Sequence, residues 1–163
     1  MIVLVLGGAR SGKSEVAEGL CRAPVTYVAT AVPRDDDMAA RVALHRARRP
    51  PSWETVEVVP GDVVDVVARH RTPETTLLLD SLTTWVAEAP DFAVDGAALC
   101  EALRARPSLS VVVSDEVGLG VHPSTEAGRL FRDRLGELNR LVADHADRVL
   151  LVVAGRVMPL DRL

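Results

Sequence analysis

Lysine is almost absent from this chain of 163 residues, which contains Lys13 alone beside eighteen arginines. Asparagine and isoleucine also occur once each, and glutamine does not occur. We interpret this usage as a GC-rich coding bias and not as a structural demand. With a formal net charge of −4, the chain has no basic footprint, so nucleic acid is not an expected partner.

Cysteine and long apolar runs are equally scarce. Cys21 and Cys100 lie far apart in the sequence, which predicts reduced thiols in the cytoplasm and not a disulfide or a metal site. No apolar run approaches the roughly 20 residues of a membrane span. The first run, residues 2–6, is too short for a signal peptide. We therefore expect a cytoplasmic protein with no membrane span, folded as one domain over residues 1–163.

The single lysine lies in the segment GGARSGKS, residues 7–14, which matches the phosphate-binding loop (P-loop) pattern G-x-x-x-x-G-K-S. In such a loop the backbone N–H groups turn inward around a polyphosphate, and the positive end of the next helix points at the same anion. Lysine reaches the phosphate oxygens as a compact charge, whereas a planar guanidinium would crowd them. An apolar strand signal precedes the loop and a helix signal follows it, which favours nucleotide binding over a chance glycine-rich turn.

Strand and helix signals alternate along the rest of the chain. We expect strands at residues 25–29, 54–59, 75–80, 109–114 and 149–154, helices at 34–48, 61–70, 97–105 and 125–145, and a loop-like segment at 86–96. This alternation predicts an α/β P-loop NTPase fold, a mostly parallel sheet with helices on both faces. Ligands bind such sheets at the carboxyl ends of the strands, where Gly7, Asp80 and Asp115 fall.

Asp80 ends the apolar segment 77–79, as an acid does in the second nucleotide motif of P-loop enzymes. There it holds Mg²⁺, directly or through water, beside the hydroxyl of the P-loop serine, here Ser14. The alternative is a strand-end aspartate that caps the next turn. With the P-loop present, the metal interpretation is favoured.

The expected helix 34–48 carries a basic face. Arg41, His45, Arg48 and Arg49 follow helical spacing. Neighbouring cations disfavour the imidazolium, and a neutral imidazole among phosphate-binding arginines is suited to attack phosphorus. The residues alone nevertheless favour a solvated basic face with an incidental histidine.

The loop at residues 115–123 contains two glycines, which suggests a sharp turn or a backbone that approaches a ligand closely. Glu116 is either catalytic or a cap of this loop, and the residues alone do not decide.

Together these motifs resemble one family, the bifunctional adenosylcobinamide kinase / adenosylcobinamide-phosphate guanylyltransferase of cobalamin biosynthesis. The likeness follows the chain in order over almost its whole length. The P-loop is common to many families, whereas its combination with the His45 segment and the Glu-Val-Gly sequence at 116–118 is specific. The matching segments are residues 7–14, 27–31, 36–46, 49–50, 53–57, 78–83, 115–120, 131–133, 139 and 152–155.

The resemblance implies a two-step enzyme. First, a hydroxyl on the aminopropanol arm of adenosylcobinamide takes the γ-phosphate of ATP or GTP. Second, GTP donates GMP to that phosphate, giving adenosylcobinamide-GDP and pyrophosphate. In the family the GMP travels on a histidine, and His45 stands at that position, so the resemblance overrides the surface interpretation.

The resemblance further implies a recombinase-like sheet, Mg²⁺, a corrinoid substrate and a homo-oligomer, a trimer in the family. His45 and Lys13 are the implied catalytic residues, and Ser14 and Asp80 the implied metal ligands. Carried over by position, the implied nucleotide contacts are Gly7, Gly8, Ala9, Arg10, Ser11, Gly12, Lys13, Ser14, Ala29, Thr30, Ala31, Arg46, Ala47, Arg48, Arg49, Glu57 and Asp80.

The chain departs from the family pattern on the expected corrinoid side. Asp115 stands where the family usually has asparagine, His122 replaces a common apolar residue, and the segment after Trp85 is shorter and lacks the usual Ser-Asn-Leu-Leu. One alternative is a single-activity small-molecule P-loop kinase, against which stands the lack of a late arginine-rich lid. Another is a non-catalytic nucleotide-binding module, which would not need the retained metal-site residues.

Overall fold

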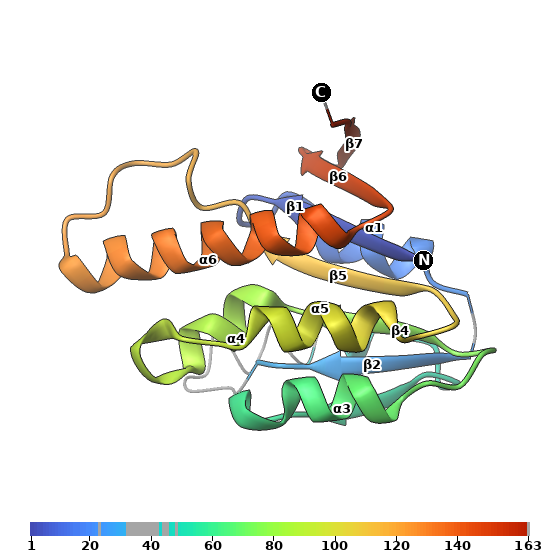
Figure 1. Cartoon of the computed structure of the whole chain (residues 1–163). Helices are drawn as coiled ribbons and strands as arrows, with labels where there is room; N and C mark the ends of the chain where they lie inside the picture. Colours follow the sequence, from blue (N-terminus) through green and yellow to red (C-terminus); the bar gives the residue numbers. More distant parts are fainter. Residues whose placement is uncertain (23, 32–42, 44–45, 48, 163) are drawn as a thin grey trace.

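The computed structural model describes residues 1–22, 24–31, 43, 46–47 and 49–162 (Figure 1). Within these residues the chain forms a seven-stranded sheet in the order β3-β2-β4-β5-β1-β6-β7. The paired strands are parallel except for β7, which runs antiparallel to β6. The strands are β1 (Ile2–Gly7), β2 (Val25–Ala29), β3 (Glu54–Glu57), β4 (Thr76–Asp80), β5 (Ser110–Asp115), β6 (Arg148–Val153) and β7 (Arg156–Leu160).

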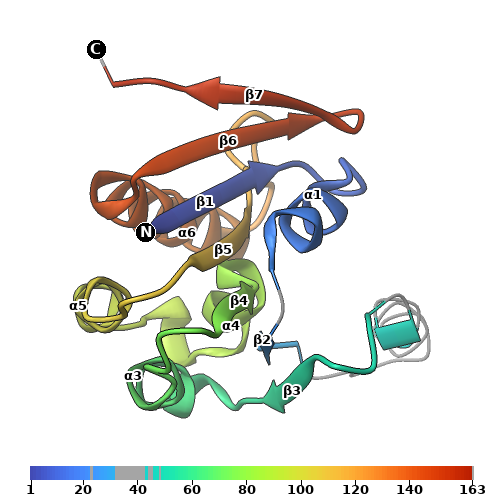
Figure 2. The ribbon, with the colours of Figure 1, turned by 90° about the vertical axis from the view of Figure 1, so that its right-hand side faces the viewer.

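Helices cover both faces of this sheet, as the sequence predicts. Figure 2 shows α1 on one face and α3, α4, α5 and α6 on the other. The α-helices are α1 (Lys13–Leu20), α3 (Val63–Arg69), α4 (Leu82–Glu88), α5 (Gly96–Arg104) and α6 (Glu126–His145), with short 3₁₀ turns η1 (Pro60–Asp62) and η2 (Pro90–Phe92). The observed sheet and layers confirm the predicted α/β fold class.

The inner strand β1 is buried along its whole length because successive side chains enter two different cores. Val3 and Val5 pack with Ala17 of α1 in one core. Leu4 and Leu6 pack in the larger core beneath α3 to α6. A strand buried on both faces is a continuous apolar run, which is why residues 2–6 gave so clear a signal.

Two elements differ from the sequence expectations. Residues 86–88 were expected in a loop, but they belong to α4, which begins with a capping box between Ser81 and Thr84. Strand β7 is the second difference, because the sequence predicts residues 149–154 as the last strand of the chain. All five β7 residues are exposed and one is Pro159, so this edge strand lacks the burial pattern that identifies strands.

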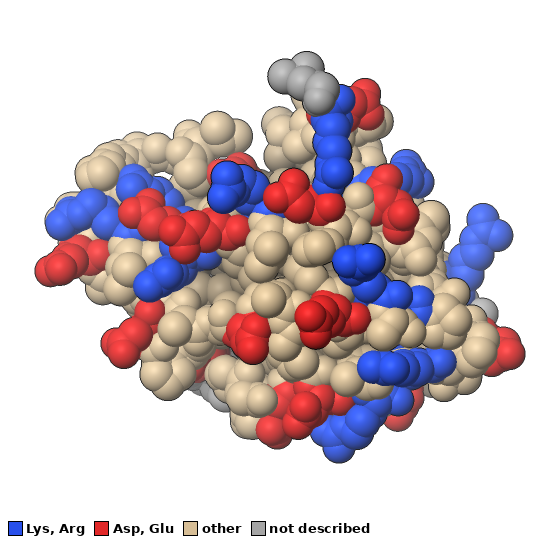
Figure 3. Space-filling model, viewed as in Figure 1, with Lys and Arg blue, Asp and Glu red and all other residues tan. Residues whose placement is uncertain are grey.

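Most of the expected helix 34–48 lies outside the described residues; Ala43, Arg46 and Ala47 within it are helical. Across the described residues, no helix combines the length and apolar character needed to cross a membrane. On the face that carries α3, α5 and α6, acidic and basic side chains are interspersed (Figure 3). That face therefore presents no broad surface of one charge.

Candidate active site

The P-loop connects the end of β1 to the start of α1 at the carboxyl edge of the sheet. Gly12 adopts a φ of 91°, a left-handed conformation that glycine tolerates without strain. At Gly7, a Cβ atom would lie 2.8 Å from the Val152 carbonyl oxygen and would also meet the Ser11 hydroxyl. Both glycines of the motif are therefore required by the backbone path and by close packing.

Two neighbouring segments hold the P-loop in place. The N–H of Gly155, in the turn between β6 and β7, donates to the Ser11 carbonyl at 2.8 Å. The N–H of Glu116, just after β5, donates to the Gly7 carbonyl at 3.1 Å. The loop is thus supported from both strands that flank β1.

Lys13 is paired with Asp115, a carboxylate at the end of β5 that the family resemblance places on the corrinoid side. Its Nζ lies 2.5 Å from Asp115 Oδ1 and also donates to the Gly8 carbonyl at 3.3 Å. The two side chains are 13% and 23% exposed. Asp115 faces Gly7 in the β1–β5 register, so the strand order, which the sequence does not give, places this carboxylate beside the P-loop.

The Asp115 backbone is itself well anchored. Its N–H donates to Thr83 Oγ1 at 2.8 Å, and its carbonyl accepts from Asn139 Nδ2 at 3.0 Å. Helices α4 and α6 therefore fix the end of β5 from the face opposite α1. The carboxylate at this position depends on the fold for its placement and not on its own ion pair.

Asp80, the predicted metal ligand, ends β4 and accepts a hydrogen bond from Tyr27. The Tyr27 hydroxyl donates to Asp80 Oδ2 at 2.6 Å, and Tyr27 is only 3% exposed. Burial raises the pKa of the Tyr27 hydroxyl above its ordinary value, and the negative charge of Asp80 and this hydrogen bond raise it further. Tyr27 therefore stays protonated and acts as a donor to the carboxylate.

The donor chemistry at this edge fits a nucleotide-bound Mg²⁺. Among the described residues, no three His, Cys, Asp or Glu side chains gather as a metal site. Mg²⁺ is usually held by one or two carboxylates together with substrate phosphates and waters, so a protein cage is not needed. A Ser14 hydroxyl and an Asp80 carboxylate match that requirement, and their assignment as ligands stays a prediction.

The residues just after His45 are attached to the sheet beside Asp80. Arg46 makes an ion pair with Glu57 at the end of β3. The Arg49 guanidinium carbon lies 3.3 Å from the centre of the Tyr27 ring, and Arg49 Nη1 donates to Thr55 Oγ1 at 3.3 Å. Among the predicted site residues, His45 and Arg48 lie outside the described residues.

The segment Ala29, Thr30 and Ala31 lies against the same strand end. Thr30 N–H donates to the Asp80 carbonyl at 3.1 Å, and the buried Thr30 hydroxyl donates to the Ser81 carbonyl at 2.7 Å. The structure thus brings the P-loop, residues 29–31, Arg46, Arg49, Glu57 and Asp80 to the carboxyl edges of neighbouring strands. The Thr30 hydroxyl is already used within the protein.

The loop after β5 contains Glu116, whose role the sequence leaves open, and His122, which departs from the family pattern. Glu116 Oε1 accepts the Gly118 N–H at 2.7 Å, which is the loop-capping contact. His122 Nδ1 lies 3.0 Å from Arg132 Nη1 on α6. No described contact joins either side chain to a P-loop side chain, although the backbone N–H of Glu116 supports the P-loop at Gly7.

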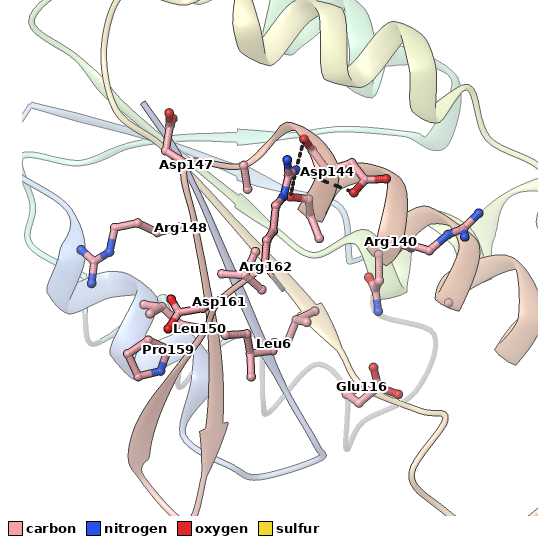
Figure 4. Close-up of a pocket in the computed structure, with 16 residues that line it drawn as sticks. Leu6, Glu116, Arg140, Asp144, Asp147, Arg148, Leu150, Pro159, Asp161 and Arg162 are labelled. Carbon is pink, nitrogen blue, oxygen red and sulfur yellow. Dashed lines mark hydrogen bonds and ion pairs between the residues drawn. The ribbon is translucent and has the colours of Figure 1, made fainter.

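A cavity of about 630 Å³ lies between α6 and the β6–β7 hairpin (Figure 4). Its charged lining is mixed, with Arg140, Asp144 and Arg162 among the contributors. Arg162 closes part of it by donating to the Ala143 carbonyl at 3.3 Å. None of the predicted nucleotide contacts that the structure describes lines this cavity, so it is distinct from the described part of the candidate active site.

Comparison with known proteins decides the family. Residues 3–160 match the sequence profile of the family described as cobinamide kinase / cobinamide phosphate guanyltransferase. The chain belongs to this family. The resemblance recognised in the sequence is thereby confirmed, and with it the assignment to cobalamin biosynthesis as a bifunctional kinase and guanylyltransferase.

Curated relatives cover nearly the whole chain. The bifunctional adenosylcobalamin biosynthesis protein CobP of Pseudomonas aeruginosa is 41% identical in an alignment of 167 positions, which covers 96% of this chain and 95% of the relative. The bifunctional adenosylcobalamin biosynthesis protein CobU of Escherichia coli is 36% identical in an alignment of 176 positions, which covers 95% of this chain and 97% of the relative.

Solved structures show the same fold at low identity. A KaiC-like protein from Pyrococcus horikoshii matches with a TM-score of 0.54 and 13% identity, over 92% of this chain and 71% of that one. The flagellar accessory protein FlaH of Methanocaldococcus jannaschii gives a TM-score of 0.52 and 14% identity, over 96% and 74%. At these identities the similarities show the shared α/β fold alone.

Proposed function

We propose that this member of the cobinamide kinase / guanyltransferase family carries out both steps at one carboxyl edge of its sheet and that His45 carries the GMP between them. The observation that carries the proposal is that Lys13 and Asp80 lie at neighbouring strand ends. Arg46 and Arg49 are bound to Glu57 and Tyr27 at the same edge of the sheet. A kinase site and a nucleotidyl-carrier segment then share one nucleotide-binding region.

In the first step the substrate hydroxyl is the nucleophile. Its oxygen attacks the γ-phosphorus of ATP or GTP, the bond to the β-phosphate oxygen breaks, and the hydroxyl proton is released. The P-loop N–H groups and the Lys13 ammonium bind the phosphate oxygens and stabilise their charge. Ser14 and Asp80 would hold Mg²⁺, which when bound neutralises charge on the β- and γ-phosphates.

In the second step a His45 ring nitrogen attacks the α-phosphorus of GTP and pyrophosphate leaves. The phosphate of cobinamide phosphate then attacks the same phosphorus, which releases His45 and forms the diphosphate bond. A histidine carrier divides one difficult displacement into two easier ones. The anchoring of Arg46 on Glu57 and Arg49 on Tyr27 supports this role, because it keeps the residues after His45 beside the metal carboxylate.

Several further features belong to the same proposal. Residues 1–163 act as one catalytic domain, the substrate is a corrinoid, and nucleic acid is not a partner. The protein works in the cytoplasm as a homo-oligomer, a trimer as in the family. The other nucleotide contacts are those carried over by position, Arg48 included.

The test uses GTP labelled at the α-phosphate. After incubation and denaturation, wild-type protein should carry acid-labile, base-stable label, and His45→Ala should carry none. His45→Ala should keep substantial kinase activity on cobinamide but make no cobinamide-GDP. His122→Ala is the matched control and should label normally.

The alternatives give different outcomes. Kinase activity without label in the wild type would indicate a single-activity kinase. Nucleotide binding without turnover of either kind would indicate a non-catalytic module. Label that moves to His122 would show that the carrier histidine has been misassigned.

A further inference from the structure

Tyr27 contacts two predicted functional groups that come from different parts of the chain. It lies in β2, opposite Leu78 of β4 and Thr55 of β3. Its hydroxyl donates to Asp80, and its ring is covered by the Arg49 guanidinium. One buried side chain therefore touches both the metal carboxylate and the segment that follows His45.

The hydroxyl end of Tyr27 restricts the Asp80 carboxylate. The 2.6 Å bond uses Oδ2, and Oδ1 receives no hydrogen bond from any described residue. A short bond to an ionised acceptor is among the strong hydrogen bonds of proteins, and such outer partners orient metal ligands. The carboxylate is therefore held in one orientation with one oxygen left for another partner.

The ring end of Tyr27 supports Arg49. A guanidinium over an aromatic face gains cation–π attraction, and Thr55 fixes one Nη atom from the side. The Arg49 Nε is buried and has no partner among the described residues. A buried, unpaired cationic donor beside the predicted phosphate site is suited to accept a phosphate oxygen as its partner.

We propose that Tyr27 is a positioning residue that orients Asp80 for the metal and holds Arg49 against the nucleotide, so that metal binding and the placement of Arg49 depend on one side chain. The assignment rests on the proposed function, since it takes the ligand to be a Mg²⁺-nucleotide. The contacts divide the two roles between the hydroxyl and the ring, and each role can be removed separately.

Tyr27→Phe removes the hydroxyl and keeps the ring. The readout is direct binding of Mn²⁺, measured by electron paramagnetic resonance in the presence of GTP, together with the Mg²⁺ concentration for half-maximal kinase activity. We expect both metal affinities to weaken about five- to tenfold, while GTP affinity without metal, measured with a fluorescent analogue, stays within twofold. Wild-type Mn²⁺ binding in a folded Tyr27→Phe would overturn the metal half of the proposal.

The control for a general loss of stability is Trp85→Phe. The Trp85 indole donates to the Pro60 carbonyl at 2.8 Å within the core beneath α3 to α6, so this variant also loses one buried hydrogen bond, but away from Tyr27. It should lower the melting temperature without changing metal affinity. A purely structural Tyr27 would behave in the same way as Trp85.

Tyr27→Leu removes the ring, and Arg49→Ala removes the group stacked on it. Each should weaken metal-free GTP binding at least fivefold and slow covalent GMP labelling. The metal-free GTP affinity of the double variant should lie within twofold of that of the single variant that binds GTP less tightly, because both changes remove the same contact. If the losses of GTP affinity in the two single variants instead add in the double variant, the proposal that the Tyr27 ring holds Arg49 is overturned. If Tyr27→Leu does not fold, unchanged metal-free GTP affinity in Arg49→Ala overturns the same half.

These outcomes are separable from the proposed function. A wild-type protein that fails to phosphorylate cobinamide would refute that function. The Mn²⁺ and GTP binding measurements on Tyr27→Phe would still decide whether Tyr27 positions the metal carboxylate.

Discussion

The ion pair between Lys13 and Asp115 predicts that Asp115→Asn tightens nucleotide binding while it destabilises the empty protein. At the 2.5 Å that separates Lys13 Nζ from Asp115 Oδ1, two unit charges near a protein surface attract by about 7 kcal/mol before desolvation is subtracted. Hydrogen bonds between charged groups retain a net value of about 1.5–3 kcal/mol. A nucleotide phosphate has to compete with Asp115 for the same ammonium, which is only 13% exposed.

Removing the competing charge should therefore favour nucleotide binding by about 1.4 kcal/mol, a tenfold lower Kd. The empty protein should lose about 1–2 kcal/mol of unfolding free energy, because among the described residues Lys13 keeps only the Gly8 carbonyl as a partner. The backbone contacts of residue 115 to Thr83 and Asn139 do not involve its carboxylate and should persist.

Calorimetric titration with GTP and urea unfolding of the empty protein measure the two effects. Asp65→Asn is the control, since Asp65 is exposed on α3 and loses the same charge far from the P-loop. It should change neither quantity appreciably. An Asp115→Asn protein that binds GTP no more tightly than wild type would refute the competition argument, whatever its stability.

Four further outcomes are expected. Lys13→Ala should lower kinase activity and GMP labelling by at least about 100-fold with unchanged circular dichroism, and full activity would contradict its role. Asp80→Asn should raise the Mg²⁺ requirement of both steps, which a metal titration checks. Leu135→Ala, at a position that is fully buried, should cost about 2–5 kcal/mol in urea unfolding. Burial, followed by the charge of Glu18, raises the pKa of the Cys21 thiol to about 12, so a thiol reagent at pH 8 should label it much more slowly than the unfolded chain. The Cys21 thiol ionises at lower pH in the unfolded chain than in the folded protein, so its contribution to the free energy of unfolding should be lost as pH rises from 9.0 towards about 12. Over that range the difference in melting temperature between wild type and Cys21→Ser should shrink.

The sequence predicted those parts of the fold whose burial leaves a pattern. Strand β1 is buried on both faces and appears as an uninterrupted apolar run. Strand β7 is exposed along its length, so pairing with β6 defines it and no local pattern does. Helix α4 begins with a local signal, the Ser81–Thr84 capping box. The residues around Pro90 give the sequence after it the pattern of a loop, so the pattern alone does not show where the helix ends.

The candidate site divides in a similar way. The P-loop is a contiguous motif, and its lysine and glycines could be assigned from spacing alone. The contacts of Tyr27 with Asp80 and of Lys13 with Asp115 join residues that are distant in the sequence. They follow from strand order, which places β4 next to β2 and β5 next to β1. Sequence alternation predicts a parallel sheet, but it does not give the order of its strands.

The strand order also has a consequence for synthesis on the ribosome. Ile2 pairs with Ser110 and Val3 with Arg148, so both neighbours of β1 emerge long after β1 itself. Such distant pairing is slow to form, because chain entropy is lost before the contacts are gained. Throughout translation the apolar β1 segment would remain unpaired and available to chaperones. The Ser11 carbonyl of the P-loop accepts its hydrogen bond from Gly155, so the loop would reach its final conformation only when the β6–β7 hairpin has formed. Retention of GTP by a nascent chain would therefore show that this hairpin is in place.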